Sequence, residues 1–297
     1  MNVADVIRRS RRLKLFIFIG IPMIYLLIFF FIPFLIALLY SLGMFKQVVY
    51  QYHFVPEPSL EYYVGLSKYP GIFKAIQRSF YYATLTTVGT LLISYPLAYY
   101  IGVKLEERYR DLAVLVVFTP FWINFLLRVY AMRFILHEAG MVNTILRLLG
   151  IITEPIRFLG TDVAVIVVMI YSYLIFMVLP LYGVLEKLNV ELLEAAYTLG
   201  ATPFRAFLRI TLPLSIPGIL AGSLLVFIPA VGEFVIPELV GGPNTTTLGT
   251  IIYSFFLRVR GVTGWGIGSA AGLIYIAMIL VASYVYMRFV GGEVRLG

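Results

Sequence analysis

Cysteine is absent from this chain of 297 residues, and histidine occurs only twice. Without cysteine the chain forms neither a disulfide nor a thiolate metal site. His53 and His137 stand far apart in the sequence, so a histidine-based metal site is not expected. Charged residues are also scarce, at 13% of the chain, whereas a soluble domain carries about 25%. These shortages exclude a disulfide framework and argue against a soluble domain.

Apolar residues dominate instead and make up 61% of the chain. A helix that crosses a bilayer needs about 20 consecutive, mainly apolar residues. Six segments reach that length, namely residues 15–42, 80–103, 112–136, 162–185, 213–239 and 267–290. The sequence therefore predicts an all-α integral membrane protein with six transmembrane helices.

The charges that remain indicate the orientation of these helices. The net charge is +8, and most cations flank the apolar segments rather than forming a soluble basic domain, so nucleic acid is not an expected partner. Five cations precede the first segment: Arg8, Arg9, Arg11, Arg12 and Lys14. Such clusters favour the cytoplasmic side, which places both termini in the cytoplasm. The first apolar run is also far longer than the core of a signal peptide, which indicates an uncleaved helix.

The order of the segments suggests two parts. Residues 1–79 hold the basic N-terminal stretch, the first helix and an external loop, 43–79, in which we expect short helices. Residues 80–297 hold the other five helices. Between the fourth and fifth helices lies a polar loop, residues 186–213, which we expect on the cytoplasmic side.

Capping residues predict the local structure of this polar loop. Asn189 is placed to cap a short helix, and Glu191 lies in the first turn, where the helix dipole favours an acid. We expect Gly200 to end that helix, since glycine adopts the left-handed conformation without steric cost. Thr202 and Pro203 would start the next helix, and we expect Pro213 to open the fifth span. Between the caps, four residues share a small apolar face suited to a partner's groove: Leu192, Ala195, Ala196 and Leu199.

The same loop carries a spaced motif. Glu194-Ala195-Ala196 is followed after three residues by Gly200, and nine residues later come Ile210, Leu212 and Pro213. This spacing resembles the signature loop with which the membrane subunits of bacterial ABC importers contact their ATPase. The tripeptide alone is common in helices and would fit an ordinary interfacial hairpin. The full pattern between two apolar segments favours the importer.

Three further stretches, residues 120–130, 180–188 and 229–242, resemble permeases of spermidine/putrescine-type ABC importers, and the likeness covers most of the chain from about Phe80 onward. The resemblance implies a type I importer permease in the bacterial inner membrane. It also implies a second, related permease subunit, two ATPase subunits and an external solute-binding protein. The chain lacks the phosphate-binding pattern G-x-x-x-x-G-K-[ST], so ATP and Mg would bind the ATPase, and this chain is expected to bind no cofactor and to catalyse no reaction.

A polyamine pathway calls for carboxylates and for aromatic faces that attract cations. Trp122 lies about 15 Å into the third segment, near the middle of the membrane. Its neighbours Phe121 and Asn124, and Tyr95 on the second segment, are further candidates for the pathway. Most aromatic residues of the spans are nevertheless expected to face lipid or to fill the core.

Acids and bases inside membrane spans point to function because they are costly there. Glu233 follows the expected kink at Pro229 and is the leading carboxylate, although it lies about 30 Å along the fifth segment and would also fit the outer interface. Glu238 is expected outside. Arg128 is unfavourable for a polycation, and we expect it to pair with an acid or to extend outward.

Several alternatives stay open at this point. The same type of permease would serve another solute, such as an opine, iron(III) or an oxyanion, and Arg128 suits an anion. An ion-coupled secondary transporter would need no ATPase and would leave the signature loop without a role. A membrane-embedded enzyme is disfavoured, since the spans hold no cluster of His, Asp and Glu with catalytic spacing.

Overall fold

The computed structural model describes residues 18–48, 51–259 and 261–291. The basic cluster at residues 8–14 and the first residues of the opening span lie outside these ranges. Within them, four helices are long and apolar enough to cross a membrane: Phe18–Ser41, Asp162–Leu185, Pro203–Val231 and Val262–Arg288. A bent pair of helices, Glu107–Trp122 with Phe125–Ile135, would make a fifth span. The chain is therefore a multi-pass membrane protein.

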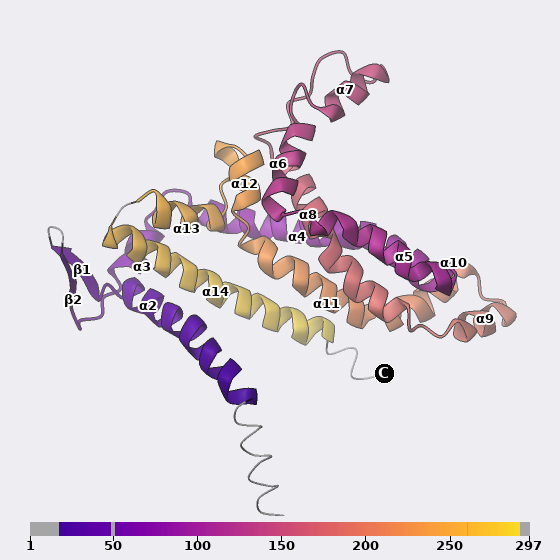
Figure 1. Cartoon of the computed structure of the whole chain (residues 1–297), viewed down its shortest axis with the longest axis horizontal. Coiled ribbons are helices and arrows are strands. Elements are labelled where there is room, and N and C mark those ends of the chain that lie inside the picture. Colours follow the sequence, from indigo (N-terminus) through magenta and orange to yellow (C-terminus); the bar gives the residue numbers. More distant parts are fainter. Residues whose placement is uncertain (1–17, 49–50, 260, 292–297) are drawn as a thin grey trace, which may run out of the picture. The chain divides into compact units, whose positions relative to one another are not determined.

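The chain divides into two compact units, and the first comprises residues up to 69 together with 254–274. Its opening helix continues through a π-helical turn, Leu27–Phe31, into α2, Ile32–Ser41. A hairpin of β1, Phe45–Val48, and β2, Gln51–Phe54, precedes α3, Glu61–Ser67 (Figure 1). Thus the expected external loop contains a strand pair as well as a short helix, and α4 already begins at Ile72.

Contacts inside this first unit fix α3 against its neighbours. The hydroxyl of Tyr63 donates to Ser41 Oγ at 3.0 Å. A Cβ on Gly266 would lie 2.2 Å from the ring of Tyr62, so only glycine fits at that position without a shift.

The second unit comprises residues 70–253 and 275–297 and is built around three long helices. These are α4, Ile72–Tyr99, α8, Asp162–Leu185, and α11, Leu212–Val231, which pack on one another (Figure 1). Polar and charged residues lower the hydropathy of α4 below that of the four long apolar helices. Three of the polar side chains in the predicted span are buried: Thr86, Thr90 and Ser94. The second predicted span thus corresponds to a helix that packs some of its polar residues against protein.

The other helices lie between these three in the sequence or follow them. They are α5, Glu107–Phe118, α6, Phe125–Ile135, α7, Met141–Leu148, α9, Val190–Thr198, α10, Pro203–Ala206, α12, Val235–Val240, α13, Leu248–Leu257, and α14, Val262–Gly291. The last two helices each pass from one unit into the other.

Glycines allow α8 and α11 to approach closely. A Cβ on Gly218 of α11 would lie 2.9 Å from the carbonyl oxygen of Pro180 on α8. A Cβ on Gly222 would lie 2.7 Å from the sulfur of Met177. Small residues at helix contacts are typical of membrane proteins, in which close van der Waals contact drives association. The α8–α11 contact is therefore tight at backbone level.

The third predicted span, residues 112–136, is wrong as a continuous helix. A 3-10 turn, Thr119–Trp122, follows α5, and the helices on either side of the break are bent by 86° (Figure 1). Pro120 lacks a backbone N–H and so weakens the helix there. Asn124 then starts α6 afresh, because its side chain accepts a hydrogen bond from the N–H of Leu126 at 2.9 Å.

The fifth predicted span is displaced towards the N-terminus. The helix begins at Pro203 and runs through a π-helical turn, Phe207–Thr211, to Val231. Pro213 therefore lies inside this helix rather than opening it, and residues 235–240 form the separate helix α12. The predicted division of the chain near residue 79 stays a prediction.

Candidate functional site

The polar loop between α8 and α11 forms the two short helices α9 and α10, and its caps confirm the local predictions. Asn189 Oδ1 accepts a hydrogen bond from the N–H of Glu191 at 2.9 Å. Gly200 has φ +84°, the left-handed conformation expected for a helix end. Thr202 Oγ1 accepts from the N–H of Arg205 at 3.4 Å, and Pro203 is the first residue of α10.

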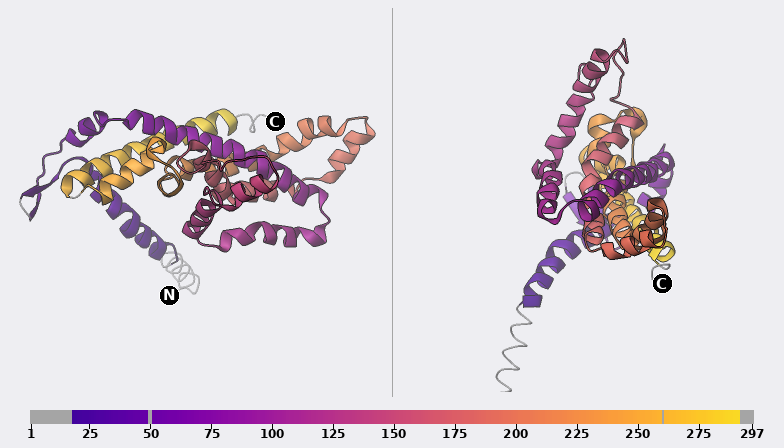
Figure 2. Two further views of the ribbon diagram at one scale, coloured as in Figure 1. Left: turned by 90° about the horizontal axis from the view of Figure 1, so that it is seen from above. Right: turned by 90° about the vertical axis from the view of Figure 1, so that its right-hand side faces the viewer.

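One face of α9 carries exposed apolar side chains. Leu199 is 88% exposed and Leu192 is 47% exposed, whereas Leu193 is buried beneath the helix. The motif residues Glu194 and Ala195 are exposed, Ala196 and Ile210 are half-buried, Leu212 is half-buried and Pro213 is exposed. Figures 1 and 2 place α9 and α10 together at one end of the α8 and α11 helices. The loop thus presents a small apolar surface at the end of the bundle.

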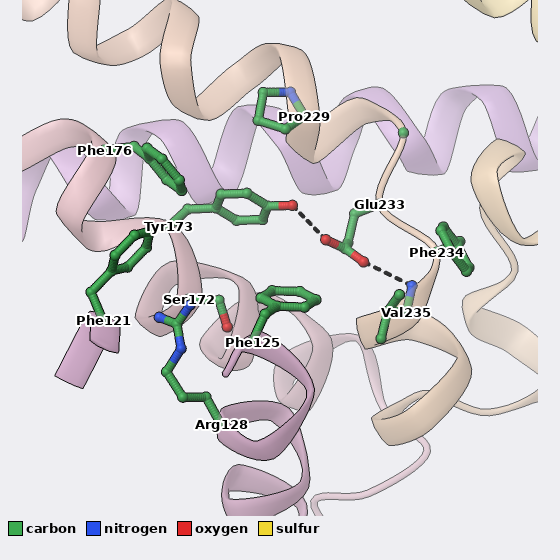
Figure 3. Close-up of a pocket in the computed structure, with 11 residues that line it drawn as sticks. Phe121, Phe125, Arg128, Ser172, Tyr173, Phe176, Pro229, Glu233, Phe234 and Val235 are labelled. Carbon is green, nitrogen blue, oxygen red and sulfur yellow. Dashed lines mark hydrogen bonds between the residues drawn. The ribbon is translucent and has the colours of Figure 1, made fainter. Parts of the chain in front are cut away.

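A second feature is a cavity of about 420 Å³ inside the same unit. Its walls come from the α5–α6 break, from α8 and from the α11–α12 junction (Figure 3). The lining residues are Phe121, Phe125, Arg128, Ser172, Tyr173, Phe176, Pro229, Gly232, Glu233, Phe234 and Val235. The cavity therefore combines one acid and one base with several aromatic rings.

Glu233 is held at the short break between α11 and α12. One carboxylate oxygen accepts hydrogen bonds from the N–H groups of Val235 at 2.7 Å and Ile236 at 3.2 Å, at the start of α12. The other oxygen accepts from the hydroxyl of Tyr173 (Figure 3). Glu233 is 7% exposed, so its carboxylate is fixed by three donors within a buried setting.

The contact with Tyr173 also fixes the position of Glu233 along α8. Tyr173 lies near the middle of the 24-residue helix α8, about 17 Å from either end at 1.5 Å per residue. The carboxylate of Glu233 therefore lies at mid-depth along α8 and away from both ends. Glu233 itself follows the last residue of the helix Pro203–Val231, so its place inside the span stays a prediction.

Arg128 lies on the first turns of α6 and contradicts the prediction that it pairs with an acid or extends outward. It is 7% exposed, and its Cζ lies 4.8 Å from the ring centroid of Phe121 and 5.9 Å from that of Phe125. Its buried Nε has no hydrogen-bond partner, and among the described residues no carboxylate lies within ion-pair distance. The α5–α6 break turns the side chain inward, so aromatic faces surround the guanidinium.

The other predicted pathway residues separate into two groups. Phe121 lines the cavity together with Glu233. Its ring packs edge-to-face against that of Phe176, with the two ring centroids 5.3 Å apart. Neither Trp122, which is 72% exposed, nor Asn124, which caps α6, is among the residues that line this cavity. Tyr95 also lies outside the cavity. Its hydroxyl is 2.8 Å from Ser215 Oγ, between α4 and α11.

Sequence reasoning missed several members of the cavity. Ser172, Phe125 and Phe176 were not singled out, and Tyr173 was one of many aromatic residues in the spans. A helical signal was available, since Tyr173 and Phe176 are three residues apart and share one face of α8. Ser172 Oγ is buried without a hydrogen-bond partner, which no sequence pattern shows.

Comparison with known proteins identifies the family. Residues 91–291 match the family described as "Binding-protein-dependent transport system inner membrane component". The chain is 40% identical over 230 residues to the spermidine/putrescine transport system permease protein PotB of Haemophilus influenzae, covering 77% of this chain and 79% of that protein. It is 38% identical over 219 residues to PotB of Escherichia coli, covering 74% and 78%.

Solved structures support the fold. A bacterial ABC transporter involved in the import of the acidic polysaccharide alginate has a chain that superposes with a TM-score of 0.75 at 21% identity, covering 94% of this chain and 97% of that one. A second structure of an alginate ABC transporter, in complex with alginate pentasaccharide-bound periplasmic protein, gives a TM-score of 0.74 at 20% identity, covering 97% and 98%. At this level of identity the likeness concerns the fold alone.

Proposed function

Since this chain belongs to the family of binding-protein-dependent transport system inner membrane components, we propose that it is the permease subunit of an ATP-driven importer of polyamines. The observation that carries the substrate class is Glu233, a buried carboxylate that lies beside the middle of α8 and lines a cavity with several aromatic rings. Carboxylates and ring faces are the groups that attract ammonium ions in a low-dielectric setting. The likeness to PotB supports the same class.

The path from ATP hydrolysis to this cavity runs along a single helix. That helix begins at Pro203, directly after α9, and ends at Val231, next to Glu233. Its 29 residues extend over about 43 Å. An ATPase that binds the apolar face of α9 would move the start of this helix, and the other end would move the cavity wall. Rocking of this kind opens a central site to alternate sides.

The proposal includes partners and an orientation. A second, related permease subunit would complete the pathway, and an external solute-binding protein would deliver the polyamine. Two ATPase subunits would bind ATP with Mg and contact α9 from the cytoplasm, through the motif from Glu194 to Pro213. Both termini would then lie in the cytoplasm, in agreement with the basic N-terminal cluster. The chain itself would catalyse no reaction.

The test measures ATP hydrolysis by the complete complex in lipid, with its binding protein, across a panel of solutes. Putrescine and spermidine are compared with ferric iron, sulfate and amino-acid derivatives. We expect the two polyamines to stimulate hydrolysis and the other solutes to have no effect. Stimulation by sulfate or iron alone would overturn the substrate class, and failure to isolate an ATPase with this chain would overturn the coupling role of α9.

Arg128 favours a second candidate, an importer of the same type for an anionic solute. Its buried Nε lacks an acceptor, and a carboxylate or oxyanion would supply one. Glu233 in the same cavity opposes a simple anion, because like charges repel strongly where water is excluded. The solute panel separates the two candidates directly.

A further inference from the structure

We propose that Arg128 is a resident cation that occupies the aromatic part of the cavity and so limits the site to one ammonium group at a time. The inference rests on the proposed function, since it concerns how an amine would bind beside Glu233. It makes Arg128 a specificity-determining residue rather than an obstacle to the substrate.

The geometry of Arg128 is that of a bound cation on ring faces. Its Cζ lies 4.8 Å from the centroid of Phe121 and 5.9 Å from that of Phe125, both within the range of a cation–π contact. The ring of Phe121 is held in turn by an edge-on contact with Phe176. A ligand ammonium would seek these same faces, and Arg128 already occupies them.

Glu233 offers the complementary place for one ammonium. Its carboxylate accepts three hydrogen bonds, from Tyr173, Val235 and Ile236. A carboxylate has about four lone-pair positions, so room for one further donor remains. The close-up shows Glu233 and Arg128 reaching into the cavity from different walls, α11–α12 and α6 (Figure 3). One end of an amine therefore has a site, and the opposite wall repels its second charge.

A diamine would consequently bind end-on, with its second ammonium directed out of the cavity. The formal charges of Arg128 and Glu233 cancel, so the empty cavity holds a polycation only weakly. Weak binding suits a transport path, which must release its substrate as well as accept it. Without Arg128, the ring faces and the unpartnered hydroxyl of Ser172 would become available to the second ammonium.

The experiment compares two amines of equal chain length, putrescine with two ammonium groups and n-butylamine with one. Their dissociation constants are measured by calorimetric titration of the complete complex in lipid nanodiscs, without the binding protein. Arg128→Met replaces the cation by a flexible apolar side chain and so frees the ring faces, whereas Arg128→Lys keeps the positive charge. Arg133→Met serves as the matched control, because Arg133 is exposed on the last turn of the same helix.

In the wild-type complex we expect the two amines to bind within about threefold of one another. Removing the Arg128 charge strengthens binding of either amine, but only putrescine has a second ammonium for the vacated rings, so Arg128→Met should strengthen putrescine binding about tenfold more than n-butylamine binding, a gain between those of exposed and desolvated cation–π contacts. Arg128→Lys and Arg133→Met should behave as the wild type.

Several results would overturn the inference. One is a ratio of the two affinities that stays the same in Arg128→Met. Another is that both Arg128→Met and Arg128→Lys no longer bind either amine. That result would mean that Arg128 binds an anionic group of the solute or of the second permease. If amines stimulate hydrolysis in the wild type while the ratio is unchanged, the proposed function stands and only this inference fails. If no amine binds or stimulates the wild type, both fail.

Discussion

At the residue scale, the carboxylate of Glu233 depends on backbone donors as much as on a side chain. The N–H groups of Val235 and Ile236 would lack partners at the start of α12 without it. Tyr173 then directs the second oxygen along the cavity. One acid thus holds the start of α12 and lines the cavity, so a substitution must separate its structural role from its charge.

Glu233→Gln makes that separation, because the glutamine oxygen still accepts the two N–H bonds while the charge is lost. We expect polyamine-stimulated ATP hydrolysis to fall tenfold to about a hundredfold, the range of a hydrogen bond to a charged group. Basal hydrolysis and assembly with the ATPase should persist. The control is Glu238→Gln, an exposed acid on α12, and an equal loss in both variants would contradict the assignment.

The sequence predicted Glu233 and Phe121 as pathway candidates but placed Trp122 above Phe121. The position of Trp122 was calculated along a continuous helix, whereas the chain turns at that residue and leaves it 72% exposed. The same turn brings Arg128 inward, where a straight helix would let it extend to an interface. Side-chain direction after a break depends on backbone angles that composition does not reveal.

At the element scale, α9 shows what local rules predict well. Its N-cap, its end at Gly200 and the restart at Pro203 all follow from residue preferences over a few positions. The break after α5 was harder, since the count of apolar residues in a window measures composition and not continuity. Pro120 and Asn124 were the available signals for it.

Gly200 gives a prediction about the shape of this loop. A Cβ at Gly200 meets nothing within 4 Å, so substitution acts only through the left-handed backbone, at a cost of about 1–2 kcal/mol. Gly200→Val should therefore disturb the end of α9 and reduce the amount of ATPase that co-purifies. More ATPase should co-purify with Gly200→Asn than with Gly200→Val, because asparagine tolerates the left-handed conformation.

The matched control for this prediction is Gly183→Ala on α8. Gly183 is also free of neighbours within 4 Å, but it lies within a helix, where alanine is favoured by about 1 kcal/mol. We expect Gly183→Ala to assemble fully. Equal co-purification from Gly200→Val and Gly183→Ala would contradict a role for the conformation of Gly200.

Gly218 gives a second element-scale prediction, based on space rather than conformation. Its Cβ would lie 2.9 Å from the carbonyl oxygen of Pro180 and 3.2 Å from Cα of Leu181, and these backbone atoms have little room to move. Gly218→Val should force α8 and α11 apart and cost about 1–3 kcal/mol, as overpacked cores do. Thermal unfolding of the purified protein in detergent should show a lower midpoint than Gly183→Ala, and an unchanged midpoint would contradict the close approach.

At the scale of the whole molecule, apolar segments predicted the helical class and the approximate positions of most spans, but not the break in the third or the start of the fifth. They did not predict that α4 buries threonine and serine, or that one helix joins α9 to the cavity wall without interruption. These features depend on contacts between distant segments, such as the α8–α11 contact at Gly218 and Gly222. Composition predicted that the chain crosses a membrane, whereas tertiary contacts determine which residues line the path.

The absence of cysteine permits a direct test of orientation, because any introduced cysteine is the only thiol in the chain. Ile151 precedes α8 and is 65% exposed, and Leu199 follows α8 and is 88% exposed. The 24 residues of α8 span about 36 Å, enough to cross the hydrocarbon core and separate the two positions. Ile151→Cys should react with a membrane-impermeant maleimide in sealed right-side-out vesicles, and Leu199→Cys only after the vesicles are opened. Reaction of Leu199→Cys in sealed vesicles would place α9 outside, where no cytoplasmic ATPase reaches it, and would refute the coupling proposed for this loop.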